Sequence, residues 1–316
     1  MPVYRLKPAC MDYLWGGTKL RDEYGINAPG EHVAEAWVLS CHPNGPSVID
    51  SGKFKGKTLI EYINEKGRAV LGSNCDRFEE FPILTKLIDA RENLSIQVHP
   101  NNQFVLNNEE TGCNGKTEMW YVVDAEPGSI IYYGVSQMVE ISEIKERIEN
   151  NTLTEILNAV PARKGDVFYI PSGTLHAICK GLVIAEVQQN SNVTYRVYDY
   201  DRVDKTTNRK RELHVDKALS VIRKYPNFRN YDFGNHLVSC KHFVVDLLEG
   251  DTLDFASERS FVSLVVIEGE GQILFKDEDG NDTSLDMKKG ECFFIPANSG
   301  RFNIKGDSLK VLRTQI

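Results

Sequence analysis

One sequence frame occurs twice in this chain of 316 residues, with the second copy 125 positions after the first. The first copy is Arg163–His176 and the second is Lys288–Arg301, and each contains the phrase Gly-acidic-x-x-x-Ile-Pro. Because self-similarity at a fixed spacing is the signature of repeated structural units, the chain is predicted to contain two related units. The last position differs, since His176 in the first copy is replaced by Arg301 in the second. This asymmetry marks His176 as a candidate functional residue.

The repeated phrase is typical of a β-hairpin at the mouth of a jelly-roll barrel. Glycine allows a tight turn, and proline ends a strand where no ladder donor is needed. Short runs that alternate apolar and polar residues between turn formers predict antiparallel strands in both halves. The fold is therefore predicted to be mainly β, with two tandem cupin-like jelly-roll β-barrels. The clearest predicted strands are Glu118–Val123, Asp166–Ile170, Leu182–Gln188, Phe243–Leu248, Phe261–Ile267, Gln272–Phe275 and Glu291–Ile295.

Few helices are predicted. Thr-x-x-Glu capping boxes at Thr58 and Thr152 are each typical of a helix N-terminus. They predict one helix near residues 58–70 and another that begins at Thr152. The polar, apolar-periodic stretch at residues 137–159 is predicted to form two helices, a small helical insertion in the first half.

The length of the chain suffices for two ordinary hydrophobic cores. Turn-forming Pro, Asn, Asp and Gly residues gather between residues 227 and 236, which predicts a boundary there. We therefore expect a catalytic, metal-binding domain at residues 1–233 and a degenerate barrel without metal ligands at residues 234–316.

The composition indicates which kinds of binding partner and which cellular compartment to expect. A net charge of −8 argues against nucleic acid, although it leaves room for a small phosphorylated substrate. The seven cysteines are widely spaced and never form a Cys-x-x-Cys pair, which favours reduced thiols. The first residues contain no apolar signal core, and no apolar run reaches membrane-spanning length. We expect a cytoplasmic protein without a membrane partner, and the oligomeric state stays open.

Four residues of the first half could form a metal site. Gln97 and His99 lie two positions apart, so in a strand their side chains share a face. Glu118 follows on the next predicted strand, and His176 begins a third. This set of nitrogen and oxygen donors without sulfur suits zinc, with iron, manganese or cobalt as alternatives. The alternative interpretation is a core His99, a surface Glu118 and a His176 in a turn.

Three cations accompany this set. Lys86 lies on an apolar strand face, where it is either an acid/base group or anion ligand, or a side chain that reaches solvent at a barrel rim. Lys116 lies two residues before Glu118 and would sit beside the metal. For Arg196, the surrounding aromatic residues favour a structural pairing with Asp199 or Asp201.

Together these residues resemble the type I mannose-6-phosphate isomerases, in the short bacterial form with two cupin-like barrels. The resemblance covers roughly residues 14–200 in family order, and the last third matches only as a degenerate cupin. The matching segments are Leu14–Gly17, Glu35–Trp37, Leu84–Asp89, Ser95–Pro100, Lys116–Trp120, Ile170–His176 and Thr194–Asp199.

The resemblance implies an aldose–ketose isomerase that interconverts mannose 6-phosphate and fructose 6-phosphate through a cis-enediol intermediate. It implies that Arg196 is an active-site arginine, which replaces the structural interpretation above, and that Lys86 and Lys116 are active-site lysines. It also implies that one zinc ion per chain is ligated by four residues: Gln97, His99, Glu118 and His176.

Two other functions are less compatible with these residues. A metal-dependent cupin oxygenase is disfavoured by Gln97 in place of a first histidine and by the surrounding cations. A cupin that binds a sugar phosphate without turnover is disfavoured by the intact ligand set and Arg196. The sequence leaves open the physiological direction, the metal used in cells, the phosphate-binding groups and the lysine that transfers the proton.

Overall fold

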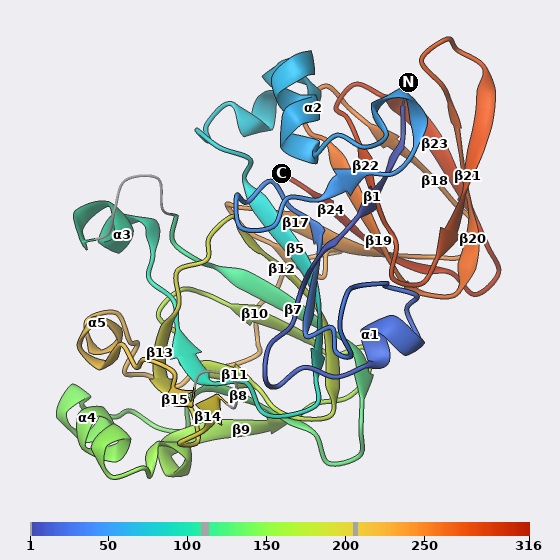
Figure 1. Cartoon of the computed structure of the whole chain (residues 1–316). Coiled ribbons are helices and arrows are strands. Elements are labelled where there is room, and N and C mark those ends of the chain that lie inside the picture. The colour runs from blue at the N-terminus through green and yellow to red at the C-terminus, as the bar shows by residue number, and fades with distance from the viewer. Residues whose placement is uncertain (1, 109–113, 205–207) are drawn as a thin grey trace. The chain divides into compact units, whose positions relative to one another are not determined.

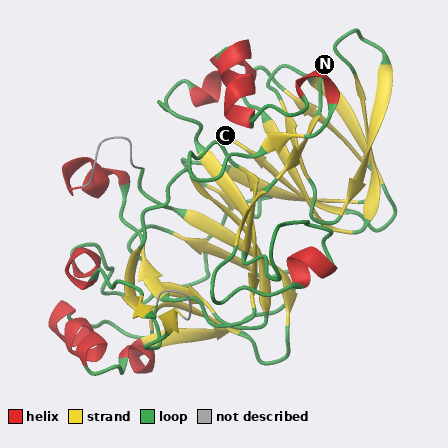
Figure 2. Ribbon diagram, viewed as in Figure 1, coloured by secondary structure: helices red, strands yellow, loops and turns green. Residues whose placement is uncertain are grey.

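The computed structural model describes residues 2–108, 114–204 and 208–316. The fold is mainly β with few helices, as predicted (Figure 1, Figure 2). The chain divides into two compact units. Unit 1 comprises Met1–Asp12, Thr18–Leu87 and Asp232–Ile316, and unit 2 comprises Tyr13–Gly17 and Ile88–Tyr231.

Unit 1 is built on two antiparallel sheets with an apolar core of residues such as Leu264, Ile273, Phe293 and Phe302. Unit 1 also contains three neighbouring strands, in which β3 (Glu35–Leu39) lies between β2 (Ala9–Met11) and β5 (Ile83–Ala90). The last three residues of β5 belong to unit 2. The seven-stranded sheet has the order β16 (Val238–Ser239), β17 (Val244–Glu249), β24 (Lys310–Gln315), β19 (Val262–Glu268), β22 (Cys292–Ile295), β1 (Tyr4–Lys7), β4 (Val48–Ile49). The four-stranded sheet has the order β18 (Thr252–Ala256), β23 (Gly300–Lys305), β20 (Glu270–Lys276), β21 (Asp282–Lys288).

Unit 2 combines a strand trio with a five-stranded sheet. In the trio, β7 (Glu118–Ala125) lies between β10 (Val167–Ile170) and β12 (Leu182–Gln189). The five-stranded sheet has the order β13 (Tyr195–Tyr198), β6 (Ile96–Val98), β11 (His176–Ile178), β8 (Ile130–Val135), β9 (Leu157–Pro161). The helices of this unit are α3 (Asn102–Asn108), α4 (Ile141–Glu149) and α5 (Val215–Leu219), and a hairpin is formed by β14 (Val203–Asp204) and β15 (Arg209–Lys210).

The helices α4 and α5 cover one face of the five-stranded sheet. Their buried residues Ile144, Ile148 and Ala218 share a core with strand residues such as Ile96 and Val197. Because side chains alternate along a strand, the residues between these apolar positions lie on the opposite face. That opposite face is therefore available for polar side chains.

The seven clearest predicted strands are confirmed as β7, β10, β12, β17, β19, β20 and β22, with limits that differ by at most two residues. The tandem barrels are not confirmed, because every sheet formed by the described residues is open and none closes into a barrel. The C-terminal strands also share a sheet with the N-terminus, since β1 pairs with β22 through Tyr4 and Phe294. The repeated sequence frame does not predict this pairing between the two ends of the chain.

Both copies of the repeated frame have the same local backbone geometry. Gly165 and Gly290 have φ values of 90° and 91°, and each precedes a strand, β10 in the first copy and β22 in the second. Gly173 corresponds to Asn298, and both have positive φ, at 88° and 60°. Asparagine is one of the few residues other than glycine that adopt this conformation readily. The shared frame is therefore a shared strand and turn.

The predicted helical segments form in part. In the first segment, α2 (Leu59–Lys66) begins at the Thr58 capping box and is followed by a 3₁₀ turn at Arg68–Leu71. The short helix α1 (Lys19–Asp22) lies outside the predicted segments. The prediction for residues 137–159 is corrected at its end, because only α4 and a 3₁₀ turn at Leu153–Ile156 are helical and β9 begins at Leu157. Thr152 makes no capping bond there, because its φ and ψ of −112° and 14° are not those of an extended cap.

Two further expectations concern membrane-spanning helices and the cysteines. Among the described residues, no helix has the length and apolar character needed to cross a membrane. The six described cysteines are free thiols, and Cys113 lies outside the described residues.

The two Thr-x-x-Glu sequences provide a matched test of capping. In the first, Glu61 N–H donates to Thr58 Oγ1 and Thr58 N–H donates to the Glu61 carboxylate. We expect Thr58→Ala to lower the free energy of unfolding by about 1 kcal/mol, because a capping acceptor is lost. Thr152→Ala, which removes no capping bond, is the control and should change it by less than about 0.5 kcal/mol. Urea unfolding of both variants checks this, and equal losses would contradict it.

Candidate functional site

The five-stranded sheet brings Gln97, His176 and Arg196 together on one face. Gln97 of β6 is the Cα partner of His176 in β11 on one side and of Arg196 in β13 on the other. Directly opposed residues in antiparallel strands point to the same face, with Cβ atoms about 5 Å apart. This is the face opposite α4 and α5, so the sheet separates the apolar core from these three polar residues.

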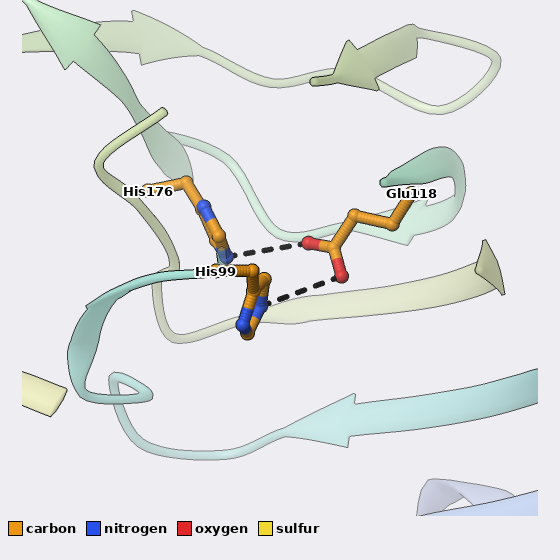
Figure 3. Close-up of side chains that lie close together, drawn as sticks. All are labelled: His99, Glu118 and His176. Carbon is orange, nitrogen blue, oxygen red and sulfur yellow. Dashed lines mark ion pairs between the residues drawn. The ribbon is translucent and has the colours of Figure 1, made fainter. Parts of the chain in front are cut away.

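His99, Glu118 and His176 form a buried cluster (Figure 3). Their candidate ligand atoms all lie within 4.8 Å of one another. His176 Nε2 lies 3.3 Å from Glu118 Oε1, and His99 Nε2 lies 3.6 Å from Glu118 Oε2. The side chains are at most 1% exposed. Three of the four predicted ligands are thus in contact range, and Gln97 is adjacent to them by its register with His176.

Backbone carbonyls orient both imidazoles. His99 Nδ1 lies 2.9 Å from the Val193 carbonyl oxygen, and His176 Nδ1 lies 2.8 Å from that of Thr174. Each Nδ1 must therefore carry the proton and donate it, which leaves each Nε2 with a lone pair directed at Glu118. An imidazole fixed in this way by its other nitrogen is the usual arrangement of a metal-binding histidine.

The donor set fits a divalent metal ion. His176 Nε2 is buried and has no hydrogen-bond partner among the described residues, although a buried polar atom normally has one. Burial, and secondly the charge of Lys116, lower the pKa of His176 to about 4, so the imidazole is neutral at neutral pH. Neutral imidazole and ionised carboxylate are the forms that bind metal. The residues present could therefore hold a metal ion, as predicted, and their chemistry does not by itself identify which one.

Lys116 contacts this cluster directly, beside Glu118 as the sequence predicted. Its Nζ lies 2.7 Å from Glu118 Oε2 and 3.2 Å from His99 Nε2, and the side chain is buried. It also lies 3.7 Å from Glu186 Oε1. Lys116 therefore places an ammonium between two carboxylates at the edge of the candidate metal site.

Glu186 was missed by the sequence analysis. It is buried in β12, opposite Trp120, and its Oε2 accepts a 2.7 Å hydrogen bond from Trp120 Nε1. A signal was present, because a single carboxylate stands among apolar residues in a strand that is buried throughout. Carboxylates are rarely buried unless they are paired, so such a residue is a candidate for a site.

Arg196 is not paired with the aspartates that the residues alone suggested. Asp199 is bound by Arg202 and Arg211, and Asp201 contacts Lys210. Arg196 instead donates through Nε to Ser95 Oγ at 3.3 Å and through one terminal nitrogen to the Glu212 carbonyl at 2.9 Å. Burial, and then the charge of Arg211, lower the pKa of Arg196. These two contacts engage Nε and one terminal nitrogen of its guanidinium.

Lys86 lies in unit 1, where it contacts a carboxylate and an aromatic ring. Its Nζ is 3.3 Å from Glu35 Oε2 and 5.1 Å from the centre of the Trp37 ring, and the side chain is buried. Glu35 Oε2 also accepts a 2.7 Å hydrogen bond from Trp37 Nε1. Lys86 therefore has a carboxylate partner, as a buried ammonium requires.

The chain is similar to proteins of one enzyme family. Residues 3–126 match the sequence profile of "Phosphomannose isomerase type I, catalytic domain", and residues 235–316 match "Mannose-6-phosphate isomerase, cupin domain". The putative mannose-6-phosphate isomerase YvyI of Bacillus subtilis is 38% identical, and the alignment covers 96% of each chain. The mannose-6-phosphate isomerase ManA of the same organism is 37% identical, with 95% of each chain covered.

Solved structures agree with these relatives. The crystal structure of the mannose 6-phosphate isomerase from Bacillus subtilis superposes with a TM-score of 0.89 at 36% identity, over the whole of both chains. A putative mannosephosphate isomerase from Archaeoglobus fulgidus has a TM-score of 0.78 at 21% identity, covering 99% of this chain and 96% of the other, and shows the shared fold.

The buried state of His176 predicts acid destabilisation of the metal-free protein. Its pKa of about 4 in the folded chain lies below the ordinary value of 6.5, so between these values the unfolded chain binds a proton that the folded chain does not. The free energy of unfolding should therefore fall as the pH drops below 6.5, by about 2 kcal/mol for this one group between pH 7 and pH 5.

This contribution should be absent in His176→Gln. Urea unfolding of chelator-treated wild type and variant at pH 7 and pH 5 measures the difference. His242, whose pKa is also lowered to about 4 mainly by burial, should leave a residual dependence in both proteins. The same loss of stability with pH in both proteins would show that His176 is not the group responsible.

Proposed function

Because this chain belongs to the type I mannose-6-phosphate isomerase family, we propose that it interconverts mannose 6-phosphate and fructose 6-phosphate through a cis-enediol intermediate. The observation that carries the proposal is the buried His99–Glu118–His176 cluster with the Lys116 ammonium 2.7 Å from its carboxylate. This arrangement supplies a metal site and a proton-carrying group at one place. The proposal includes a cytoplasmic location, a catalytic domain in residues 1–233 and a degenerate, cupin-like domain in residues 234–316.

The cofactor in this proposal is one zinc ion per chain, held by Gln97, His99, Glu118 and His176. A divalent ion bound there would stabilise the negative charge that develops on the two oxygens of the enediolate, an effect worth several kcal/mol in such sites. The chain's own part is to hold the ligands ready. The Val193 and Thr174 carbonyls fix the two imidazoles, so that little reorganisation is needed when the ion binds.

The reaction requires removal of a proton from the carbon next to a carbonyl and its return to the neighbouring carbon. Lys116 Nζ is the proposed proton carrier because it is buried beside the cluster, and its ammonium must release a proton before the amine can accept the one from carbon. Glu186 Oε1, at 3.7 Å, could take that proton through one intervening water. Lys86 is the alternative carrier, and its Glu35 contact makes a similar pair in unit 1. We favour Lys116, because it contacts two residues of the cluster directly.

Arg196 is proposed as the anion-binding residue. It shares its sheet face with Gln97 and His176, and a permanently charged guanidinium there could stabilise the enediolate or hold the phosphate. The Ser95 and Glu212 contacts fix its direction without neutralising its charge.

The direct test is a coupled assay of mannose 6-phosphate isomerisation before and after chelation, with zinc added back. We expect chelation to abolish the activity and zinc to restore it, because the enediolate then regains its stabilising charge. Glu118→Gln should not recover with zinc, since it replaces the central ligand by a neutral amide. A metal-loaded protein that does not isomerise the substrate would contradict the proposal. Oxygen consumption with iron would then indicate an oxygenase, and tight sugar-phosphate binding alone would indicate a binding protein.

We expect Arg196→Ala to lower kcat by about 10²- to 10³-fold, because one preorganised charge is lost from the transition state. The matched control is Arg301→Ala, since Arg301 occupies the position of His176 in the second copy of the frame and is exposed. The control should keep wild-type kinetics. Steady-state rates of the zinc-loaded proteins measure this difference. Near-full turnover by Arg196→Ala would show that the arginine has no role in the reaction.

A further inference from the structure

Gln189 is hydrogen-bonded to both backbone polar groups of Thr117, to one through its buried side-chain amide and to the other through its own backbone. Gln189 Oε1 accepts a hydrogen bond from Thr117 N–H at 3.0 Å, and the backbone N–H of Gln189 donates to the Thr117 carbonyl at 3.1 Å. The Gln189 residue is 4% exposed. Thr117 is the residue between Lys116 and Glu118, so this contact lies at the centre of the segment that delivers both functional side chains.

The ordinary strand ladder does not extend to Lys116. Strand β7 begins at Glu118, and its register with β12 ends at the pair Gln188 and Glu118. Thr117 and Lys116 therefore lie beyond the strand. At Thr117 the backbone of β12 still donates one hydrogen bond, from Gln189 N–H, but the acceptor for Thr117 N–H is the Gln189 side-chain oxygen. This side-chain bond helps to fix the direction in which the chain enters β7.

Further contacts hold the same segment from its other side. Gln189 Nε2 donates to Asn102 Oδ1 at 3.0 Å, and this oxygen also accepts from Gly115 N–H at 3.0 Å. Lys116 N–H donates to the Pro100 carbonyl at 3.0 Å. Gly115 is packed so closely that a Cβ there would lie 2.5 Å from the backbone nitrogen of Asn102. The three residues before β7 thus have little freedom to move.

The residues that follow Gln189 orient His99. Ser191 Oγ donates to the Asn114 carbonyl at 2.5 Å and accepts from Val193 N–H at 3.3 Å. The Val193 carbonyl in turn accepts from His99 Nδ1. One short segment after β12 is therefore hydrogen-bonded to the supports of both His99 and the Lys116–Glu118 pair.

We propose that Gln189 is a positioning residue, which acts through Thr117 to direct the Lys116 ammonium and the Glu118 carboxylate at His99 and His176. It touches neither substrate nor metal. The effect on turnover rests on the proposed function, whereas the effect on metal binding rests only on the geometry of the cluster.

The test compares Gln189→Leu with Gln272→Leu. The control removes an exposed amide that donates to Asp286 in unit 1, and it should behave as wild type. Cobalt(II) is the probe, because its absorption spectrum reports ligand geometry independently of activity. For Gln189→Leu we expect cobalt affinity, measured by chelator competition, to fall about 10- to 100-fold with an altered spectrum. We expect kcat of the zinc-loaded protein to fall by a similar factor, while KM changes less than about threefold.

Gln189→Leu that is folded by circular dichroism and keeps wild-type cobalt affinity and spectrum would overturn the proposal, even with a lower melting temperature. If Gln189→Leu does not fold, Gln189→Asn decides, because it keeps a side-chain amide at this position but withdraws it from Thr117 by one methylene. A two- to fivefold loss of cobalt affinity would support the proposal, and unchanged affinity would overturn it. A wild-type protein that binds cobalt but does not isomerise mannose 6-phosphate would refute the proposed function, while the cobalt comparison would still decide the role of Gln189.

Discussion

The buried carboxylate of Glu118 is the constraint around which the candidate site is arranged. A charge that is fully removed from water is costly unless nearby groups compensate it. Here the Lys116 ammonium supplies positive charge, with Nζ at 2.7 Å, whereas the two imidazole Nε2 atoms at 3.3 and 3.6 Å present lone pairs to the carboxylate. A metal ion ligated by these groups would add positive charge at the same place. The requirement that keeps Glu118 stable in the interior is therefore also what makes the cluster suited to a cation.

Strand alternation allows one thin sheet to serve two purposes. In β6, Ile96 and Val98 pack into the core beneath α4 and α5, while Gln97 between them faces the other side. The same alternation in β13 buries Tyr195 and Val197 and turns Arg196 to the side of Gln97. The helices thus do not contribute side chains to the site, but they fix the sheet whose register aligns the polar residues.

The sequence was sufficient where the signal is local. Alternating apolar residues located the main strands, and the donor types at Gln97, His99, Glu118 and His176 indicated a metal site whose histidines and carboxylate do meet. The sequence was insufficient where contacts with residues distant in the chain determine the local structure. Thr152 has the same motif as Thr58 but not the same backbone geometry, and the pairing of β1 with β22 joins residues nearly 300 positions apart.

The supports of the site were also hidden from the sequence for a physical reason. Glu186 contacts Trp120 and Lys116, which lie far away in the chain. Gln189 likewise contacts Thr117 and Asn102. No spacing rule connects such partners, since they meet only because β7 and β12 pair. A glutamine at the end of a strand is otherwise an ordinary surface residue, and only its burial distinguishes this one.

The two copies of the repeated frame show what a site requires beyond a scaffold. Their strands and turns agree, yet His176 is buried opposite Gln97 and Tyr133, whereas Arg301 is exposed opposite Phe255. A histidine placed at position 301 would therefore have no glutamine beside it in the neighbouring strand and no burial to lower its pKa. The frame supplies the position of a ligand, but the register partners and the exclusion of water make that position functional. The change from histidine to arginine in the second copy is consistent with this, because on a solvated sheet face a charged side chain is stable and an isolated metal ligand gains nothing.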